Sequence, residues 1–290
     1  MTYIVTSEYS LSQVAPPNLP LAPTGYDQLY QEQLNNVLRL YFNQLNKIVS
    51  QLKTDGTGDG SSLSFPYGAF HQDGTTTLST GISNVSTTPI SVASTTSFPS
   101  AGWILIESEI IQYTGKTSTT FTGITRGVLG TTNVAHTAGV DISEAQGTGS
   151  PTTIGTVLFN NTDYSNDVYA SVDYSKIYFN KPGLYNLQLS VQLLNFTTSD
   201  DNVTIWLRKN GSDVVASAGI EQVNSKHGSS PGATIASWNY FLDVAAGDYV
   251  QLAWVSDSGN TVVATYPAGA SPVHPVSPAL IFTASFVSAL

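Results

Sequence analysis

The sequence predicts a mainly β protein that carries one long helix near its N-terminus. Beyond residue 76, apolar and polar residues alternate in short runs that Gly, Pro and Ser interrupt, as in antiparallel strands. Residues 33–52 instead repeat their apolar side chains every three or four positions, which is the period of a helix. These patterns divide the chain into an extended arm at 1–26, a helix at 27–53, a linker at 54–75, a small β-barrel or sandwich module at 76–146, and an antiparallel jelly-roll sandwich at 153–290.

The N-terminal arm contains Pro16, Pro17, Pro20 and Pro23. Proline fixes its backbone and lacks an N–H group, so this density of prolines favours an extended chain over a helix or a strand. Two interpretations remain open, a disordered terminus and an anchoring arm that becomes ordered when it docks on a partner.

The predicted helix carries a heptad seam, and Thr24 or Asp27 can cap its N-terminus. An isolated helix of about 39 Å is only marginally stable, because most helix stability comes from burying the apolar stripe. The helix can pack on its own β-domain or associate with copies of itself. The Gly-rich segment 54–62 separates it from the β-region and favours a coiled coil between copies. The seam consists of Leu34, Leu38, Tyr41, Leu45, Ile48 and Leu52.

The strongest strand signals lie in the C-terminal half of the chain. Apolar residues recur there at every second position, which places them on one buried face of each strand. Asn210-Gly211 between two such runs predicts a tight hairpin. Repeated short antiparallel strands without helices are typical of a sandwich or jelly roll. The inward-facing positions are Leu187, Leu189, Val191, Leu193, Val203, Ile205, Leu207, Trp238, Tyr240, Leu242, Val244, Val250, Leu252 and Trp254.

Composition excludes several classes of function. Charged residues make up only 10% of the chain, against about 25% in ordinary soluble proteins. The net charge is −10 and the ten Lys and Arg form no cluster, so we expect no nucleic-acid partner and no anionic membrane surface. The absence of cysteine excludes disulfides, thiolate zinc sites and cysteine nucleophiles. The first residues lack the features of a signal peptide, and no apolar run approaches the roughly 18 residues of a membrane span, so we expect synthesis in a cytoplasm without membrane insertion.

The sequence contains no recognisable catalytic or metal-binding motif. The four histidines lack zinc spacing, and His136 is expected to be structural or exposed. Asp200-Asp201 and residues 162–167 do not follow the spacing of a calcium loop. Glu107 and Glu109 are predicted to share one face of a strand, whereas a glycosidase needs two carboxylates that face each other. We therefore predict a protein that is not an enzyme, with no catalytic residue, no metal site and no cofactor.

Binding through loops remains, because loops at one end of a sandwich carry recognition in many families. The candidate loops are 196–201, 223–233 and 265–278. Their side chains are suited to hydrogen bonding and stacking on a glycan, although ordinary connecting loops would have the same composition. The candidate receptor-facing residues are Asp200, Asp201, Lys226, His227, Tyr266 and His274.

The module resembles a small β-module that recurs in structural proteins of tailed bacteriophages. The matching segment runs from Phe98 to Ile142 and covers about 45 residues of the chain. It keeps the order Phe-Pro, Glu-Ile-Ile-x-Tyr-Thr-Gly, Thr-Arg-Gly and Ala-His-x-x-Gly.

The C-terminal region resembles the jelly roll of the complement-component and tumour-necrosis-factor superfamily, in the version found on phage fibres. The resemblance rests on segments 177–193, 200–214 and 238–254. Phe179, Tyr185 after Gly183, and the Gly247-Asp248 turn stand at the positions of the superfamily's motifs. Members typically form compact trimers that bury aromatic edges about a threefold axis, which implies that the helix joins three chains.

Taken together, the resemblances imply a homotrimeric fibre or spike of a tailed-phage virion, on the tail or on the head. The arm would bind other virion proteins through residues 1–26, the module would act as a spacer, and the jelly roll would face a host-surface glycan or protein. A capsid decoration protein is the alternative, and a glycan depolymerase is a distant one. A cytokine-like ligand conflicts with the lack of a signal peptide.

Overall fold

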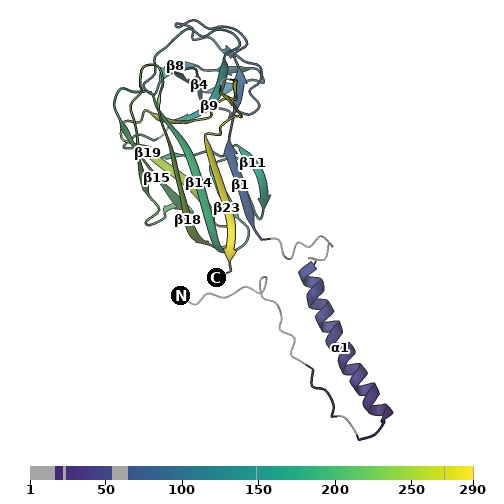
Figure 1. Ribbon diagram of the computed structural model, residues 1–290. Coiled ribbons are helices and arrows are strands. Elements are labelled where there is room, and N and C mark those ends of the chain that lie inside the picture. Colours follow the sequence, from purple (N-terminus) through teal and green to yellow (C-terminus); the bar gives the residue numbers. More distant parts are fainter. Residues whose placement is uncertain (1–16, 22–23, 54–64, 148, 271, 290) are drawn as a thin grey trace. The chain divides into compact units, whose positions relative to one another are not determined.

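The computed structural model describes residues 17–21, 24–147, 149–270 and 272–289 apart from 54–64, and the side chains of residues 48–53 are not among the described ones (Figure 1). The described chain is mainly β, with antiparallel sheets and a single helix, as predicted. It divides into two compact units, residues 1–65 with 289–290, and residues 66–288. Of the predicted arm, residues 17–21 and 24–26 contain no helix or strand, and the rest lies outside the described residues.

Helix α1 spans Gln28–Lys53, which confirms the predicted element. Asp27 is its N-cap, because its Oδ1 accepts hydrogen bonds from the backbone N–H groups of Leu29 (2.8 Å) and Tyr30 (3.3 Å). Four seam residues lie on one side of the helix and are half-buried, whereas Leu40 and Phe42 beside the seam are mostly exposed. The side chains of Ile48 and Leu52 lie outside the described residues. The half-buried seam residues are Leu34, Leu38, Tyr41 and Leu45.

Two antiparallel sheets face each other in the unit 66–288 (Figure 1). The first contains, in spatial order, β11 (Asn161–Asn166), β1 (Tyr67–Gln72), β23 (Leu280–Ser288), β14 (Gly183–Asn195) and β18 (Gly232–Val244). The second contains, in order, β12 (Val168–Ala170), β13 (Ile177–Phe179), β19 (Tyr249–Ser256) and β15 (Asp201–Lys209). Strands β16 (Ser212–Asp213) and β17 (Gly219–Val223) pair with β15, and β10 (Gly155–Thr156) pairs with β19.

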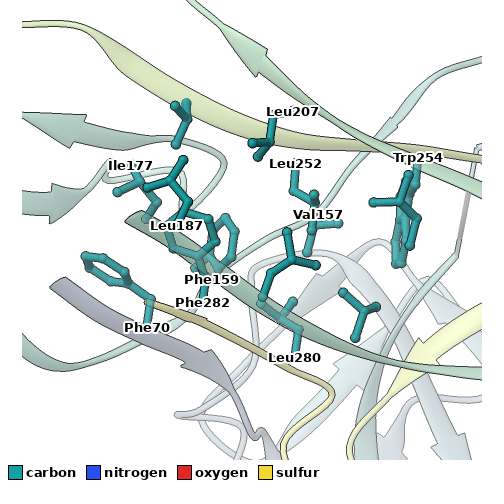
Figure 2. Packing of buried hydrophobic residues seen from close by; sticks show 14 of the residues in the cluster. Phe70, Val157, Phe159, Ile177, Leu187, Leu207, Leu252, Trp254, Leu280 and Phe282 are labelled. Atoms are coloured by element: carbon teal, nitrogen blue, oxygen red, sulfur yellow. The ribbon is translucent and has the colours of Figure 1, made fainter. Parts of the chain in front are cut away.

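The core between the sheets consists of the side chains that the alternation places inward (Figure 2). Leu187 of β14, Leu207 of β15, Trp254 of β19 and Phe282 of β23 are all at most 1% exposed. Among the predicted inward positions, only Trp238 and Tyr240 remain half-exposed. The Asn210-Gly211 hairpin is confirmed, because Lys209 pairs with Ser212 and both turn residues have positive φ angles of 52° and 80°.

Strand β1 corrects the predicted linker at 54–75. Residues 67–72 form this strand, which pairs with β11 along most of its length and with β23 at Gln72. The Phe70 side chain of β1 is 0% exposed in the core of the sandwich. The sequence predicts a linker here because residues 67–72 are too few to show a clear alternation of apolar and polar side chains. The module is therefore inserted between the first strand of the sandwich and the remaining ones.

The module continues the first sheet rather than forming a separate one. At Leu193–Asn195, β14 pairs with β20 (Thr261–Ala264), which pairs with β9 (Asp141–Gly147). The sheet then extends through β4 (Gly102–Ile106), β5 (Glu109–Tyr113) and β8 (Thr125–Val128), and β2 (Thr75–Thr77) also pairs with β9. A three-stranded sheet of β3 (Ile90–Ser91), β7 (Thr120–Thr122) and β6 (Gly115–Lys116) covers the module core around Phe121.

A second apolar cluster joins the module to the sandwich. It combines Leu105 and Ile110 of the module with Leu194, Phe196 and Val262 of the sandwich. The sequence pattern also predicts a linker at 147–152, but this segment packs against β19, since Gly149 forms a bridge with Val255 and a Cβ on Gly149 would clash with the backbone of Thr153 and Gly155. The two β-regions therefore form one unit with a shared sheet and a shared apolar junction.

Both ends of this unit lie at the same end of the sandwich, away from the module (Figure 1). The backbone N–H of Phe286 donates to the carbonyl of Pro66 at 3.0 Å, and Ser288 pairs with Leu184 at the start of β14. The module adjoins the opposite end of β14, at Asn195. The prediction that the module is a spacer before the sandwich is therefore wrong, because the chain passes through β1 first.

Replacing Phe70 with alanine is expected to lower the free energy of unfolding by about 3–5 kcal/mol, because it opens a cavity between the two sheets. The matched control is Phe65→Ala, five positions earlier and 57% exposed, for which a loss below about 1 kcal/mol is expected. Chemical denaturation measures both. Equal losses for the two variants would contradict the placement of β1 in the core.

Candidate functional site

Two of the predicted binding loops are joined at the module end of the sandwich. The backbone N–H of Lys226 donates to the carbonyl of Thr197 at 2.8 Å, and the N–H of Ser225 donates to Asp200 Oδ1 at 2.8 Å. The Asp200 carboxylate thus fixes the neighbouring loop while it remains exposed, and the side chains of Lys226 and His227 are exposed as well. These three residues form an accessible polar patch, which we name the distal loop patch.

Asp201 does not belong to this patch, contrary to the prediction. It is 3% exposed, and its Oδ2 accepts hydrogen bonds from Thr261 Oγ1 (2.5 Å), Ser256 Oγ (2.8 Å) and Ser258 Oγ (2.8 Å). Burial raises the pKa of this carboxyl, but the hydrogen bonds outweigh it and hold the pKa below the usual value. Asp201 therefore fixes the turn between β19 and β20 and cannot contact a receptor.

Tyr266 is also in a different environment from the one predicted. Its ring is half-buried against the apolar junction cluster, and burial raises the pKa of its phenol. Its backbone bonds to Ser277 in both directions, at 3.0 and 2.9 Å, which closes the excursion between β20 and β23. His274 lies exposed on this excursion, in the small hairpin of β21 (Gly269–Ala270) and β22 (Val273–His274).

The module contains a buried network of charged side chains. Arg126 donates to both oxygens of Glu109, from Nε and from Nη2, at 2.6 Å each. His136 bridges two carboxylates, with Nε2 2.9 Å from Glu109 Oε2 and Nδ1 2.7 Å from Glu107 Oε2. Burial alone would raise the pKa of Glu109, but these partners lower it to about 2. Burial alone would lower the pKa of His136, yet the two carboxylates raise it.

The same network corrects the prediction for the glutamate pair. Glu107 lies in the turn between β4 and β5 with a positive φ of 53°, so the two residues are not neighbours on one strand. Arg126 also donates to the carbonyls of Ser83 (3.0 Å) and Val134 (2.6 Å), which ties three loops of the module together. Since Glu109, Arg126 and His136 are buried and hydrogen-bonded to one another and to the surrounding backbone, this arrangement holds the loops of the module together.

Glu144 is a further buried carboxyl that sequence reasoning missed. It is 1% exposed on β9, and burial raises its pKa to about 8. Asn160 Nδ2 donates to Oε2, whereas Oε1 has no hydrogen-bond partner of normal geometry. The only available signal was a charged residue among apolar and small ones in "DISEAQG". A cavity of about 180 Å³ lies beside it, with Gly102, Gln146, Gly155 and Leu158 in its lining.

The described residues were compared with the requirements of a metal site and of a membrane-spanning helix. Within those residues, no three His, Asp or Glu side chains are grouped so that they could hold a metal ion. Helix α1, the one helix described, is not apolar enough over its length to cross a bilayer.

The sequence matches no family model, and a search of curated proteins gives no match either.

Replacing Glu109 with glutamine is expected to lower the free energy of unfolding by about 3 kcal/mol at neutral pH, because it leaves the buried Arg126 without a counter-charge. The pKa of Glu109 is about 2 in the folded protein and 4.5 as the reference value. The ionised Glu109 therefore contributes its full share to the free energy of unfolding at pH values above 4.5. This contribution is lost as the pH falls toward the pKa of about 2 in the folded protein.

The difference between wild type and Glu109→Gln should shrink accordingly as the pH falls through this window. Thermal unfolding at a series of pH values measures it, with Glu221→Gln on β17, a half-exposed glutamate, as the control. A difference that stays constant down to the lowest pH would show that Glu109 is not ionised in the fold.

Proposed function

We propose that this protein is a non-enzymatic structural protein of a tailed-phage virion, a trimeric tail or head fibre with a jelly-roll head for host attachment. Residues 1–26 would bind other virion proteins, and the protein would be made in the host cytoplasm and end in the virion. The resemblance of the module and of the C-terminal region to phage structural proteins motivates this proposal. The two facing sheets support the finer description of the C-terminal region as a jelly roll.

The polarity of the unit 66–288 is the observation that carries the attachment role. The chain enters at Pro66 and leaves at Ser288 at one end, while the distal loop patch and the module lie at the other. If the chain is anchored through its N-terminal arm, the surface beside Asp200 and Lys226 is the one turned away from the point where the anchor joins. This is the arrangement that a receptor-binding fibre requires.

Two surfaces suit the formation of a homotrimer. The first is the seam of α1, whose apolar stripe needs a partner to be stably buried. The second is the outer face of β18, β14 and β23, where Gln188, flanked by Asn239 and Thr283, lies in the middle. Large apolar side chains are exposed around these amides and hydroxyls, and the charged side chain of this face, Asp243 of β18, lies toward one end of it, opposite Leu184. The exposed apolar residues of this face are Ile235, Phe241, Ile281 and Val287.

A face with little charge matters because each chain carries a net charge of −10. Copies that meet through a highly charged face would place like charges against each other in a region of low dielectric, which is costly. Copies that meet through the uncharged middle of the outer face of β18, β14 and β23, away from Asp243, limit this repulsion and bury exposed apolar area.

Replacing Ile235 with lysine is expected to weaken the trimer, because it would bring like charges together at the outer face of β18. Sedimentation velocity over a dilution series should show dissociation at a concentration at least about tenfold higher than in wild type, which for a trimer corresponds to a loss of roughly 2.7 kcal/mol per trimer. The matched control is Ile154→Lys in the turn before β10, which is 49% exposed outside this face. A wild-type mass of one chain at micromolar concentration would overturn the trimer itself.

Gold labelling of purified particles with an antibody raised against residues 153–290 is expected to mark the tail tip or the tail collar. Label scattered over the capsid would instead favour the decoration protein, whose deletion should reduce the heat stability of heads and leave adsorption unchanged. Particles without label would overturn the assignment to a virion. Release of reducing ends from host polysaccharide by purified protein would favour the depolymerase.

A further inference from the structure

The cavity beside Glu144 lies where the module meets the sandwich. Pro99, Gly102, Glu144 and Gln146 line it from the module side, and Gly155, Thr156 and Leu158 line it from the sandwich side. Its volume of about 180 Å³ is well above the roughly 10–15 Å³ that a single water needs, so it has room for a small polar molecule. The half-exposed side chains of Thr156 and Leu158 bring the cavity to the surface of the protein.

The register of the sheet explains why the cavity exists. Ile104 of β4 pairs with Glu144 of β9, so Gly102 lies opposite Gln146, two residues further along each strand. Because side chains alternate along strands, Glu144, Gln146 and the position of Gly102 share one face of the sheet. Gly102 has no side chain to fill the space, and a Cβ there would come to 3.3 Å from Tyr113 Oη.

The polar groups around the cavity are not all satisfied by the protein. Gln146 is occupied, since its Oε1 accepts from the N–H of Leu158 at 2.9 Å and its Nε2 donates to Gln72 Oε1 at 2.5 Å. Glu144 Oε1 is buried without a hydrogen-bond partner of normal geometry, although the neighbouring Gln72 side chain interacts with this carboxyl. Glu144 lines the cavity, and a buried polar atom without a full partner is costly unless a molecule bound in the cavity supplies one.

We propose that this cavity binds a single neutral sugar ring, with the Glu144 carboxyl as its principal hydrogen-bonding group. A hydroxyl both donates and accepts, so it can satisfy the Glu144 carboxyl in either role. Pro99 and Leu158 offer apolar contact to the C–H faces of such a ring. A charged ligand is disfavoured, because anions would meet Asp73 nearby and no cationic side chain lines the cavity in the described part of the chain.

The protonation of Glu144 supports the choice of a neutral ligand. Burial raises its pKa to about 8, the neighbouring Gln72 lowers it, and the charge of Asp73 raises it. At neutral pH the group is therefore a carboxylic acid that can donate a hydrogen bond to a hydroxyl. Tyr113 faces the same carboxyl from β5, and its pKa is raised by burial and by Glu144.

This inference names a ligand class for the proposed attachment role. Its biological meaning rests on that proposed function, whereas the binding itself can be tested separately. The experiment is saturation-transfer NMR on the full chain with the methyl glycosides of glucose, galactose, N-acetylglucosamine and rhamnose as probes. We expect transfer to at least one neutral glycoside at neutral pH, and a loss of at least about tenfold in affinity as the pH rises above the pKa of Glu144, because an ionised carboxylate cannot donate.

Four variants locate the signal. Thr156→Trp should block the rim of the cavity and abolish transfer, whereas Thr204→Trp, on a half-exposed threonine of β15, should leave it unchanged. Leu158→Trp, at a half-exposed residue of the same cavity lining, serves as the second blocking variant if Thr156→Trp does not fold. Glu144→Gln should keep binding and remove its pH dependence, because the amide is neutral and can donate throughout.

No transfer to any neutral glycoside would overturn the proposal, as would a signal that persists in both blocking variants. Transfer to methyl glucuronide alone would also overturn it, since that ligand carries a negative charge. These outcomes are independent of the virion assignment, because the sedimentation mass and the particle labelling do not depend on Glu144.

Discussion

Strand β14 is the constraint on which the rest of the β-unit depends. Its thirteen residues pair with β18 along their full length on one side. On the other side the partner changes, because β23 occupies Leu184 to Val191 and β20 occupies Leu193 to Asn195. The first part closes the sandwich and the second part leads into the module through β20 and β9. A single strand thereby sets the register of both regions, and a one-residue slip would turn its buried leucines outward.

Three buried carboxylates show how differently this scaffold treats charge. Glu109 and Asp201 are surrounded by donors, so their pKa values are lowered and they remain ionised in the fold. Glu144 has too few donors, and its pKa is raised. A raised pKa means that the folded state holds the proton more tightly, so stability falls as pH rises from the reference value of 4.5 to about 8. The first two stabilise turns and loops, whereas the third weakens the junction at which it lies, a pattern typical of a binding position.

The sequence alone predicts the environment of a residue correctly wherever that environment depends on near neighbours in the chain. The alternation around Leu187 and Val203, the Asn210-Gly211 turn and the Asp27 cap all follow from local chemistry, and all are confirmed. Failures arose where the environment depends on distant segments. Asp201 resembled an exposed loop residue because its three hydroxyl partners lie about sixty positions away. Strand β1 resembled a linker because its main partner, β11, follows about ninety positions later.

The insertion of the module also changes how a fibre built from this chain would work. A spacer between an anchor and a head only has to separate the two, so its surface does not have to pack against the head. An insertion after β1 is instead held by the shared sheet and by the cluster around Leu105 and Leu194, which restricts its motion against the sandwich. Loop Gly130 of the module comes close to Thr197, next to the distal loop patch. A receptor that meets Asp200 and Lys226 would therefore meet the module as well, and a rigid pair of surfaces loses less entropy on binding than two flexibly linked ones.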